Sequence, residues 1–169
     1  IPSQTAFFLA EIGVENPTRA GLAIGLFNFT AGLTSLAYSR IRARLSAETI
    51  FALVYGLGGV GFVMTGLAET FTATMIAMAV GGFSVGAFLP SINLAIISRA
   101  SMSVRGRALG ALTTMFFLGQ FFSPVYAVPI ASASSVGNAF VVSGGVLFVL
   151  SAGFVFIKVN QRLRRHPPV

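Results

Sequence analysis

The chain has 169 residues, of which 55% are hydrophobic and only 9% are charged. Soluble domains carry about 25% charged residues, so this composition excludes an ordinary water-soluble globule and predicts a surface that faces lipid. The net charge of +7 does not indicate a nucleic-acid binder, because the basic residues stand in short clusters between long apolar segments. Cysteine is absent, which excludes disulfides and thiolate metal sites.

The first apolar segment, residues 1–12, is short. At 1.5 Å per residue it covers about 18 Å of a hydrocarbon core that is about 30 Å thick. An interfacial helix is the alternative, but the segment lacks a charged face, so we expect a membrane span that begins before this chain does. Asn16 and Pro17 then predict a new helix, since Asn caps helices and Pro suits the first helical position.

Five longer apolar segments follow. Each has the roughly 20 residues that a transmembrane helix needs, and none shows the ten-residue alternation of a barrel strand. The chain is therefore predicted to be all-α, a polytopic transmembrane helical bundle. Turns are expected at Glu69–Thr70 and at residues 131–137, and the spans at about 17–39, 47–68, 71–98, 108–130 and 138–159.

The basic residues divide unevenly between the two ends of these spans. If every segment crosses the membrane once, ten of the eleven Lys and Arg residues fall on one side, and the exception is Arg19. The positive-inside rule assigns that side to the cytoplasm. We therefore expect a multi-pass protein of a plasma membrane, the bacterial inner membrane, with a cytoplasmic C-terminus. The ten residues are Arg40, Arg42, Arg44, Arg99, Arg105, Arg107, Lys158, Arg162, Arg164 and Arg165.

No acidic residue lies deep in a span, because Glu11, Glu15, Glu48 and Glu69 are all near span ends. A carboxylate that couples transport to protons is therefore expected outside this chain. The single histidine, His166, is expected to be a solvated residue of the tail. Paired carboxylates, a Ser/His/Asp set and metal-ligand clusters are not found, so neither an enzyme nor a cofactor is predicted.

Small and polar residues recur at helical spacing in the span at 17–39. Glycine and serine stripes commonly let helices pack closely in lipid, which is one explanation of the pattern. Asn28 differs, because an amide in a membrane needs partners, and a place on a substrate pathway explains it equally well. The stripe consists of Gly21, Gly25, Asn28, Gly32, Ser35 and Ser39.

The span at 71–98 carries a second stripe, formed by Gly82, Gly86, Pro90 and Asn93. Pro90 cannot donate a hydrogen bond to the carbonyl of Gly86, so a bend is predicted there. Bends at membrane depth often lie beside cavities, and simple helix packing is the alternative.

The span at 108–130 has the face most similar to a small-molecule site. It mixes hydroxyl groups, an amide and aromatic rings, as ligand pockets do, and the alternative is that the rings face lipid or other helices. Gln4 is a further candidate amide, and Pro124 predicts a second bend. The face consists of Gly110, Thr113, Thr114, Phe117, Gln120, Phe121 and Pro124.

Several segments, in order, resemble the C-terminal half of a major facilitator superfamily transporter, helices seven to twelve. The resemblance covers essentially the whole chain. Within the superfamily, the chain is similar to bacterial drug-efflux members. It rests on residues 1–9 (IPSQTAFFL), 39–45 (SRIRARL), 84–93 (SVGAFLPSIN), 105–110 (RGRALG) and 119–124 (GQFFSP).

The resemblance implies half of a twelve-helix fold, whose other six-helix half would be the partner of this chain. It implies secondary active transport of a small solute by alternating access, driven by protons. The implied pathway residues are Gln4, Asn28, Asn93, Thr113, Thr114, Phe117, Gln120 and Phe121, with bends at Pro90 and Pro124 and topology or gate residues at Arg40, Arg42, Arg44, Arg105 and Arg107. The alternative is a non-transporting membrane scaffold or assembly protein.

Overall fold

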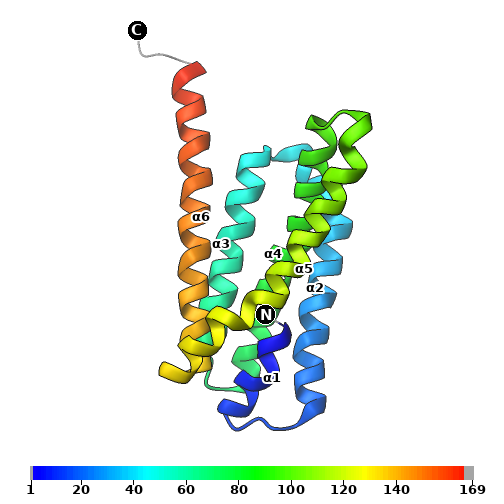
Figure 1. Cartoon of the computed structure of the whole chain (residues 1–169). Helices are drawn as coiled ribbons and strands as arrows, with labels where there is room; N and C mark the ends of the chain where they lie inside the picture. Colours follow the sequence, from blue (N-terminus) through cyan, green and yellow to red (C-terminus); the bar gives the residue numbers. More distant parts are fainter. Residues whose placement is uncertain (1, 166–169) are drawn as a thin grey trace.

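The chain folds into helices joined by short connections. A computed structural model describes residues 2–165, so Ile1 and His166 lie outside the described residues. Figure 1 shows the helices, and within the described range no strand is formed. The predicted all-α bundle is confirmed, and five helices are long and apolar enough to cross a membrane. The helices are α1 (Pro2–Glu11), α2 (Pro17–Arg44), α3 (Ala47–Gly66), α4 (Phe71–Arg99), α5 (Met102–Ala133) and α6 (Val136–Arg165).

Local capping explains where three helices begin. The side chain of Asn16 accepts a hydrogen bond from the backbone N–H of Thr18 at 2.9 Å, and Pro17 occupies the first helical turn, as predicted. Ser46 and Thr70 cap α3 and α4 in the same way. Each cap satisfies a backbone donor that the first turn leaves without a helical partner.

Helices α2, α5 and α6 extend further than the apolar segments predicted, whereas α3 ends at Gly66, two residues early. α2 continues to Arg44 rather than residue 39, α5 begins at Met102 rather than 108, and only Ser134 and Ser135 separate α5 from α6. Arginine is a good helix former, and its long side chain reaches water from a helix that has left the hydrocarbon. We expected five arginines to lie in loops between the spans, but they lie in helices: Arg40, Arg42 and Arg44 in α2, and Arg105 and Arg107 in α5.

Helix α3 lies at the centre of the packed helices, with α4 and α6 against it and α2 against α4. The α3–α4 contact is close at Gly61, where a Cβ atom would lie 2.7 Å from the backbone nitrogen of Gly81. Ser84 of α4 donates a hydrogen bond to the carbonyl oxygen of Val54 at 2.7 Å, and Ser151 of α6 donates to that of Ala52 at 2.7 Å. Small residues and hydroxyl groups thus join three helices, as is common in lipid.

Helix α1 is attached to the start of α6. Phe8 is buried, and its ring meets the edge of Phe140 with centroids 5.7 Å apart. The carboxylate of Glu11 accepts a hydrogen bond from the backbone N–H of Val136 at 3.0 Å, and so caps α6. A carboxylate at a helix N-terminus is favoured by the helix dipole.

Helix α5 is packed far less than the others. Ala127 is the single buried residue that it contributes to the described core. In Figure 1 its yellow C-terminal part runs at an angle to its green N-terminal part, and Pro124 and Pro129 both lie in the C-terminal part. Each proline removes one helical hydrogen bond and crowds the preceding turn, which favours a change of direction.

Candidate functional site

The predicted face of α5 forms an open hollow of about 730 Å³. Phe117 is 61% exposed and Phe121 is 75% exposed, so neither ring is covered by another described helix. Every lining residue belongs to α5, so no other described helix forms a wall of this hollow. The lining residues are Gly110, Thr113, Thr114, Phe117, Leu118 and Phe121.

Glycines on α5 confirm that this helix is uncovered. A Cβ atom added at Gly106, Gly110 or Gly119 would meet no atom within 4 Å. By contrast, a Cβ at Gly59 of α3 would lie 3.1 Å from the carbonyl oxygen of Gly144. These three glycines of α5 are therefore not used for packing against the described helices.

The polar groups on α5 keep hydrogen-bonding capacity. Thr113 donates its hydroxyl hydrogen to the carbonyl oxygen of Leu109 at 3.0 Å, but its oxygen can still accept. The side chains of Thr114 and Gln120 are exposed and make no hydrogen bond within the described residues. Gln120 lies on the same helix but does not line the hollow. The face thus combines two exposed rings with neutral donors and acceptors.

The stripe on α2 is a second uncovered face. Asn28 is exposed, and its Nδ2 donates to the carbonyl oxygen of Ile24 at 2.8 Å. A Cβ atom at Gly21, Gly25 or Gly32 would meet nothing within 4 Å. These glycines therefore form no packing seam with the described helices, and Asn28 retains its acceptor oxygen.

The stripe on α4 divides into two parts. Gly82 and Gly86 pack against the backbone of α2, beside the carbonyl groups of Phe27 and Ala31, so helix packing explains them. Asn93 is exposed beyond this contact, while Pro90 is half-buried inside a helix that continues to Arg99.

Gln4 does not line the α5 hollow. It lines a small pocket of about 60 Å³ where α1 meets α5 and α6. The same pocket is also lined by Ser123 and Tyr126 of α5 and by Ser143 of α6, which were not among the predicted pathway residues. Their spacing on α5 is visible in the sequence, but the contact between α1 and α6 is not.

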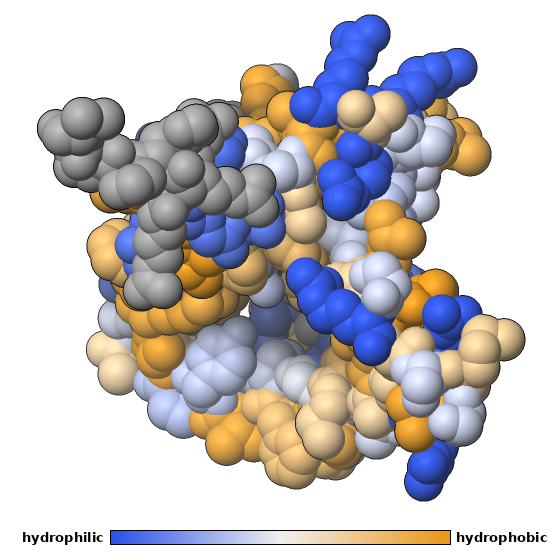
Figure 2. All heavy atoms as spheres, turned by 90° about the horizontal axis from the view of Figure 1, so that it is seen from above, coloured by the Kyte–Doolittle hydropathy of each residue, from blue (hydrophilic) through white to orange (hydrophobic). Residues whose placement is uncertain are grey.

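The last turns of α2 carry Arg40, Arg42 and Arg44, and the first turns of α5 carry Arg105 and Arg107. Figure 1 shows that these two helix ends lie at the same end of the molecule. Figure 2 looks onto this end and shows strongly hydrophilic residues around a central hollow. Two of the predicted topology or gate arginines donate hydrogen bonds to backbone carbonyl groups. Arg42 donates to the carbonyl oxygen of Leu45 at 2.8 Å, and Arg105 donates to that of Ala100 at 3.0 Å. Arg40, Arg44 and Arg107 are exposed.

Comparison with known proteins identifies the family. The chain matches the family model of the Major Facilitator Superfamily over residues 4–168. The chain belongs to the major facilitator superfamily. It is also 28% identical over 104 residues to YuxJ of Bacillus subtilis (strain 168), an uncharacterized MFS-type transporter. That match covers 62% of this chain and 26% of the relative, so the chain spans a minor part of the relative's length.

Membership of the superfamily explains the exposed apolar surface. Rings and aliphatic side chains on α5 and α6 that would be unstable in water lie, in a multi-pass membrane protein, against lipid or other protein. The chain is such a protein. Among its uncovered faces, that of α5 carries two threonines and a glutamine at helical spacing.

Proposed function

We propose that this chain forms the C-terminal six-helix half of a secondary active transporter, which moves a small solute across the membrane by alternating access. The observation that carries the proposal is the uncovered face of α5, where Phe117 and Phe121 lie beside Thr113, Thr114 and Gln120. A pathway between two halves of a transporter needs faces that are complete only when the other half is present. The other six-helix half would supply the opposite wall.

The chemistry of this face favours a largely apolar substrate. The rings of Phe117 and Phe121 offer apolar contact, and the neutral amides of Asn28, Asn93 and Gln120 offer hydrogen bonds. The solute would be a small molecule of the kind that drug-efflux members export. Pro90 and Pro124 would shape the helices that line its path.

Coupling to protons requires a carboxylate that can be protonated within the membrane. The acids of this chain, Glu11, Glu15, Glu48 and Glu69, lie at or near helix ends. We therefore place the coupling carboxylate in the other half of the transporter.

The orientation follows from the arginines. The end that carries Arg40, Arg44 and Arg107 would face the cytoplasm of a bacterium, with the C-terminus on the same side. Arg105 holds the end of α4 and would remain close to the inner gate. A membrane-impermeant thiol reagent that reached Ala43→Cys from outside intact cells would contradict this orientation.

The pathway assignment is tested by removing the amides. In the complete protein, Asn93→Leu and Gln120→Leu should each lower the apparent affinity for exported lipophilic dyes about 2- to 12-fold, the value of one lost hydrogen bond. Dye export from energised vesicles is the measurement. Asn138→Leu, an exposed amide at the start of α6, is the matched control.

Two results would count against the assignment. If both variants export every dye as the native protein does, the amides are not on the pathway. If no dye, sugar or ion moves in the native protein, a membrane scaffold becomes the better description of the chain.

A further inference from the structure

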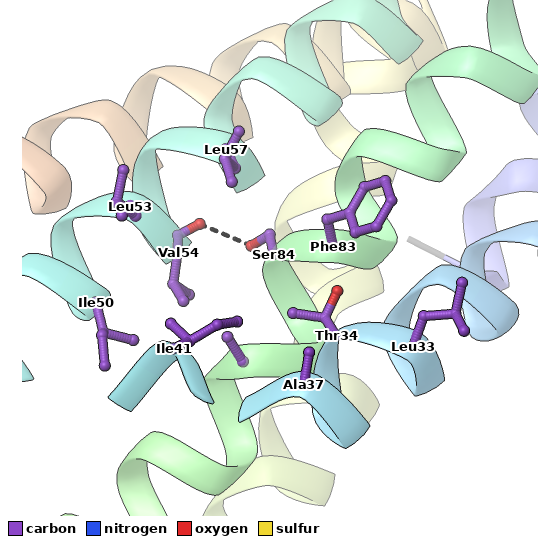
Figure 3. A pocket seen from close by; sticks show the side chains of 11 residues that line it. Leu33, Thr34, Ala37, Ile41, Ile50, Leu53, Val54, Leu57, Phe83 and Ser84 are labelled. Atoms are coloured by element: carbon purple, nitrogen blue, oxygen red, sulfur yellow. Dashed lines mark hydrogen bonds between the residues drawn. The ribbon is translucent and has the colours of Figure 1, made fainter. Parts of the chain in front are cut away.

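Two apolar grooves run along opposite sides of α3, away from the proposed pathway. The first groove, of about 470 Å³, lies between α2, α3 and α4 (Figure 3). The second, of about 530 Å³, lies between α3 and α6. Leu53 and Leu57 line both grooves, so they form a ridge between them. No residue of α5 lines either groove.

The ridge is a continuous exposed stripe. Thr49, Leu53, Leu57 and Val60 are separated by four, four and three residues, which places them on one face of α3. Leu53, Leu57 and Val60 are 48%, 42% and 38% exposed. At 1.5 Å per residue the stripe is about 17 Å long, close to half of a hydrocarbon core of about 30 Å. The second groove is lined along this whole stripe and has about the length of one membrane leaflet, whereas the first groove, lined on α2 from Leu33 to Ile41, is about 12 Å long.

A cation stands at the same end of each groove. Lys158 lines the second groove, and its Nζ donates to Thr49 Oγ1 at 2.6 Å. With about 100° between successive residues, Arg44 lies about 35° from the centre of the α2 face that lines the first groove, and Arg40 about 75° from it. Both arginines are exposed, and Ile41 between them lines the groove.

These three cations lack acidic partners among the described residues. The acid in the first turn of α3 is Glu48, and it interacts electrostatically with Arg42 and Arg99. Glu48 also lies about 135° around α3 from the centre of the exposed ridge. Arg40, Arg44 and Lys158 therefore present an uncompensated positive charge at the end of the two apolar grooves.

We propose that this surface is a binding site for one anionic phospholipid. One acyl chain lies in each groove, on either side of Leu53 and Leu57, and the phosphate lies between Arg44 and Lys158, with Arg40 beside it. Two apolar grooves that converge on one cationic end match a molecule with two chains and one anionic headgroup. Positive clusters at the membrane surface attract such lipids. The site is separate from the α5 face and does not depend on the proposed substrate.

The charge requirement is tested by lipid retention. The complete protein is purified in the presence of both phosphatidylglycerol and phosphatidylcholine. Native mass spectrometry then identifies the lipid that remains bound. We expect retention of one phosphatidylglycerol in preference to phosphatidylcholine. The double variant Arg44→Ala/Lys158→Ala should lose about 30-fold in that preference. Arg107→Ala removes an exposed arginine from the same end, remote from both grooves, and should leave it unchanged.

The grooves are tested with both charges in place. Ala37→Phe fills the first groove and Val155→Trp fills the second, whereas Val149→Trp adds the same bulk to an exposed position of α6 outside both grooves. The first two variants should lose the retained lipid and the third should keep it. Equal retention of the two lipids by the native protein, or equal losses in the double variant and in Arg107→Ala, would overturn the proposal. Binding of inorganic phosphate by a native protein that retains no lipid would also overturn the proposal, because the cations would then bind an anion alone.

Discussion

Single glycines decide how closely α2 and α4 approach each other. Gly82 packs directly against the carbonyl of Phe27 and the hydroxyl of Thr30, where a Cβ atom has no space. Other glycines of the chain, such as Gly145 on α6, face open space. The same residue type therefore has opposite consequences at different positions, although all of these glycines look alike in the sequence.

This difference can be measured. Gly82→Ala should lower the free energy of unfolding of the complete protein by about 1–3 kcal/mol, since the new methyl group forces α2 and α4 apart. Gly145→Ala should leave it unchanged or raise it by about 0.5–1 kcal/mol, because alanine favours a helix more than glycine does. Unfolding in detergent with increasing denaturant is the measurement, and equal effects of the two substitutions would contradict the described α2–α4 contact.

At the scale of helices, buried hydroxyl groups contribute differently to helix association, depending on the carbonyl group to which they donate. Ser84 donates across the interface to α3, whereas Ser91 on the same helix donates to the carbonyl oxygen of Ala87 within α4 at 2.6 Å. Both side chains are buried. Only the first therefore contributes directly to the association of two helices.

Ser84→Ala should destabilise the α3–α4 contact by about 0.6–1.7 kcal/mol, the range for hydrogen bonds between membrane helices. Ser91→Ala should cost less, because the carbonyl of Ala87 keeps its ordinary place in the helix. The two variants are compared by denaturant unfolding of the complete protein. A larger loss in Ser91→Ala than in Ser84→Ala would show that the interhelical bond is not a main source of stability.

The existence of the helices could be predicted from the sequence, because it depends on local properties. Long apolar segments and the cap at Asn16 are visible without knowledge of the fold. The ends of α2 and α5 were not predictable from hydropathy, because helices continue beyond the hydrocarbon wherever arginine favours them. The α5 face was predictable from helical spacing, whereas the pocket that joins Gln4 to Tyr126 was not, since it depends on contacts between distant segments.

At the scale of the whole molecule, one side of the chain is packed and the other is uncovered. Helices α2, α3, α4 and α6 form the closely packed part, with the two grooves of the proposed phospholipid site on its surface. The faces of α5 and α2 that carry the candidate pathway residues remain uncovered. A transporter that rocks one rigid half against the other requires this division.

Exposure alone does not distinguish a pathway from a lipid-facing surface. Phe117 of α5 is 61% exposed, and Phe156 of α6 is 70% exposed. We propose that Phe117 faces water and that Phe156 faces lipid. Because this chain contains no cysteine, single introduced cysteines can test this difference.

The most direct test is cysteine labelling of the complete protein in membranes, with a water-soluble maleimide. Any cysteine elsewhere in the complete protein is first replaced by serine, and single cysteines then replace Thr113, Phe117 or Phe156. The account predicts that the first two positions are labelled and that substrate slows their labelling, while Phe156→Cys remains unlabelled. Labelling of Phe156→Cys at the same rate as Phe117→Cys, or no labelling at either α5 position, would contradict the claim that α5 lines a transport pathway.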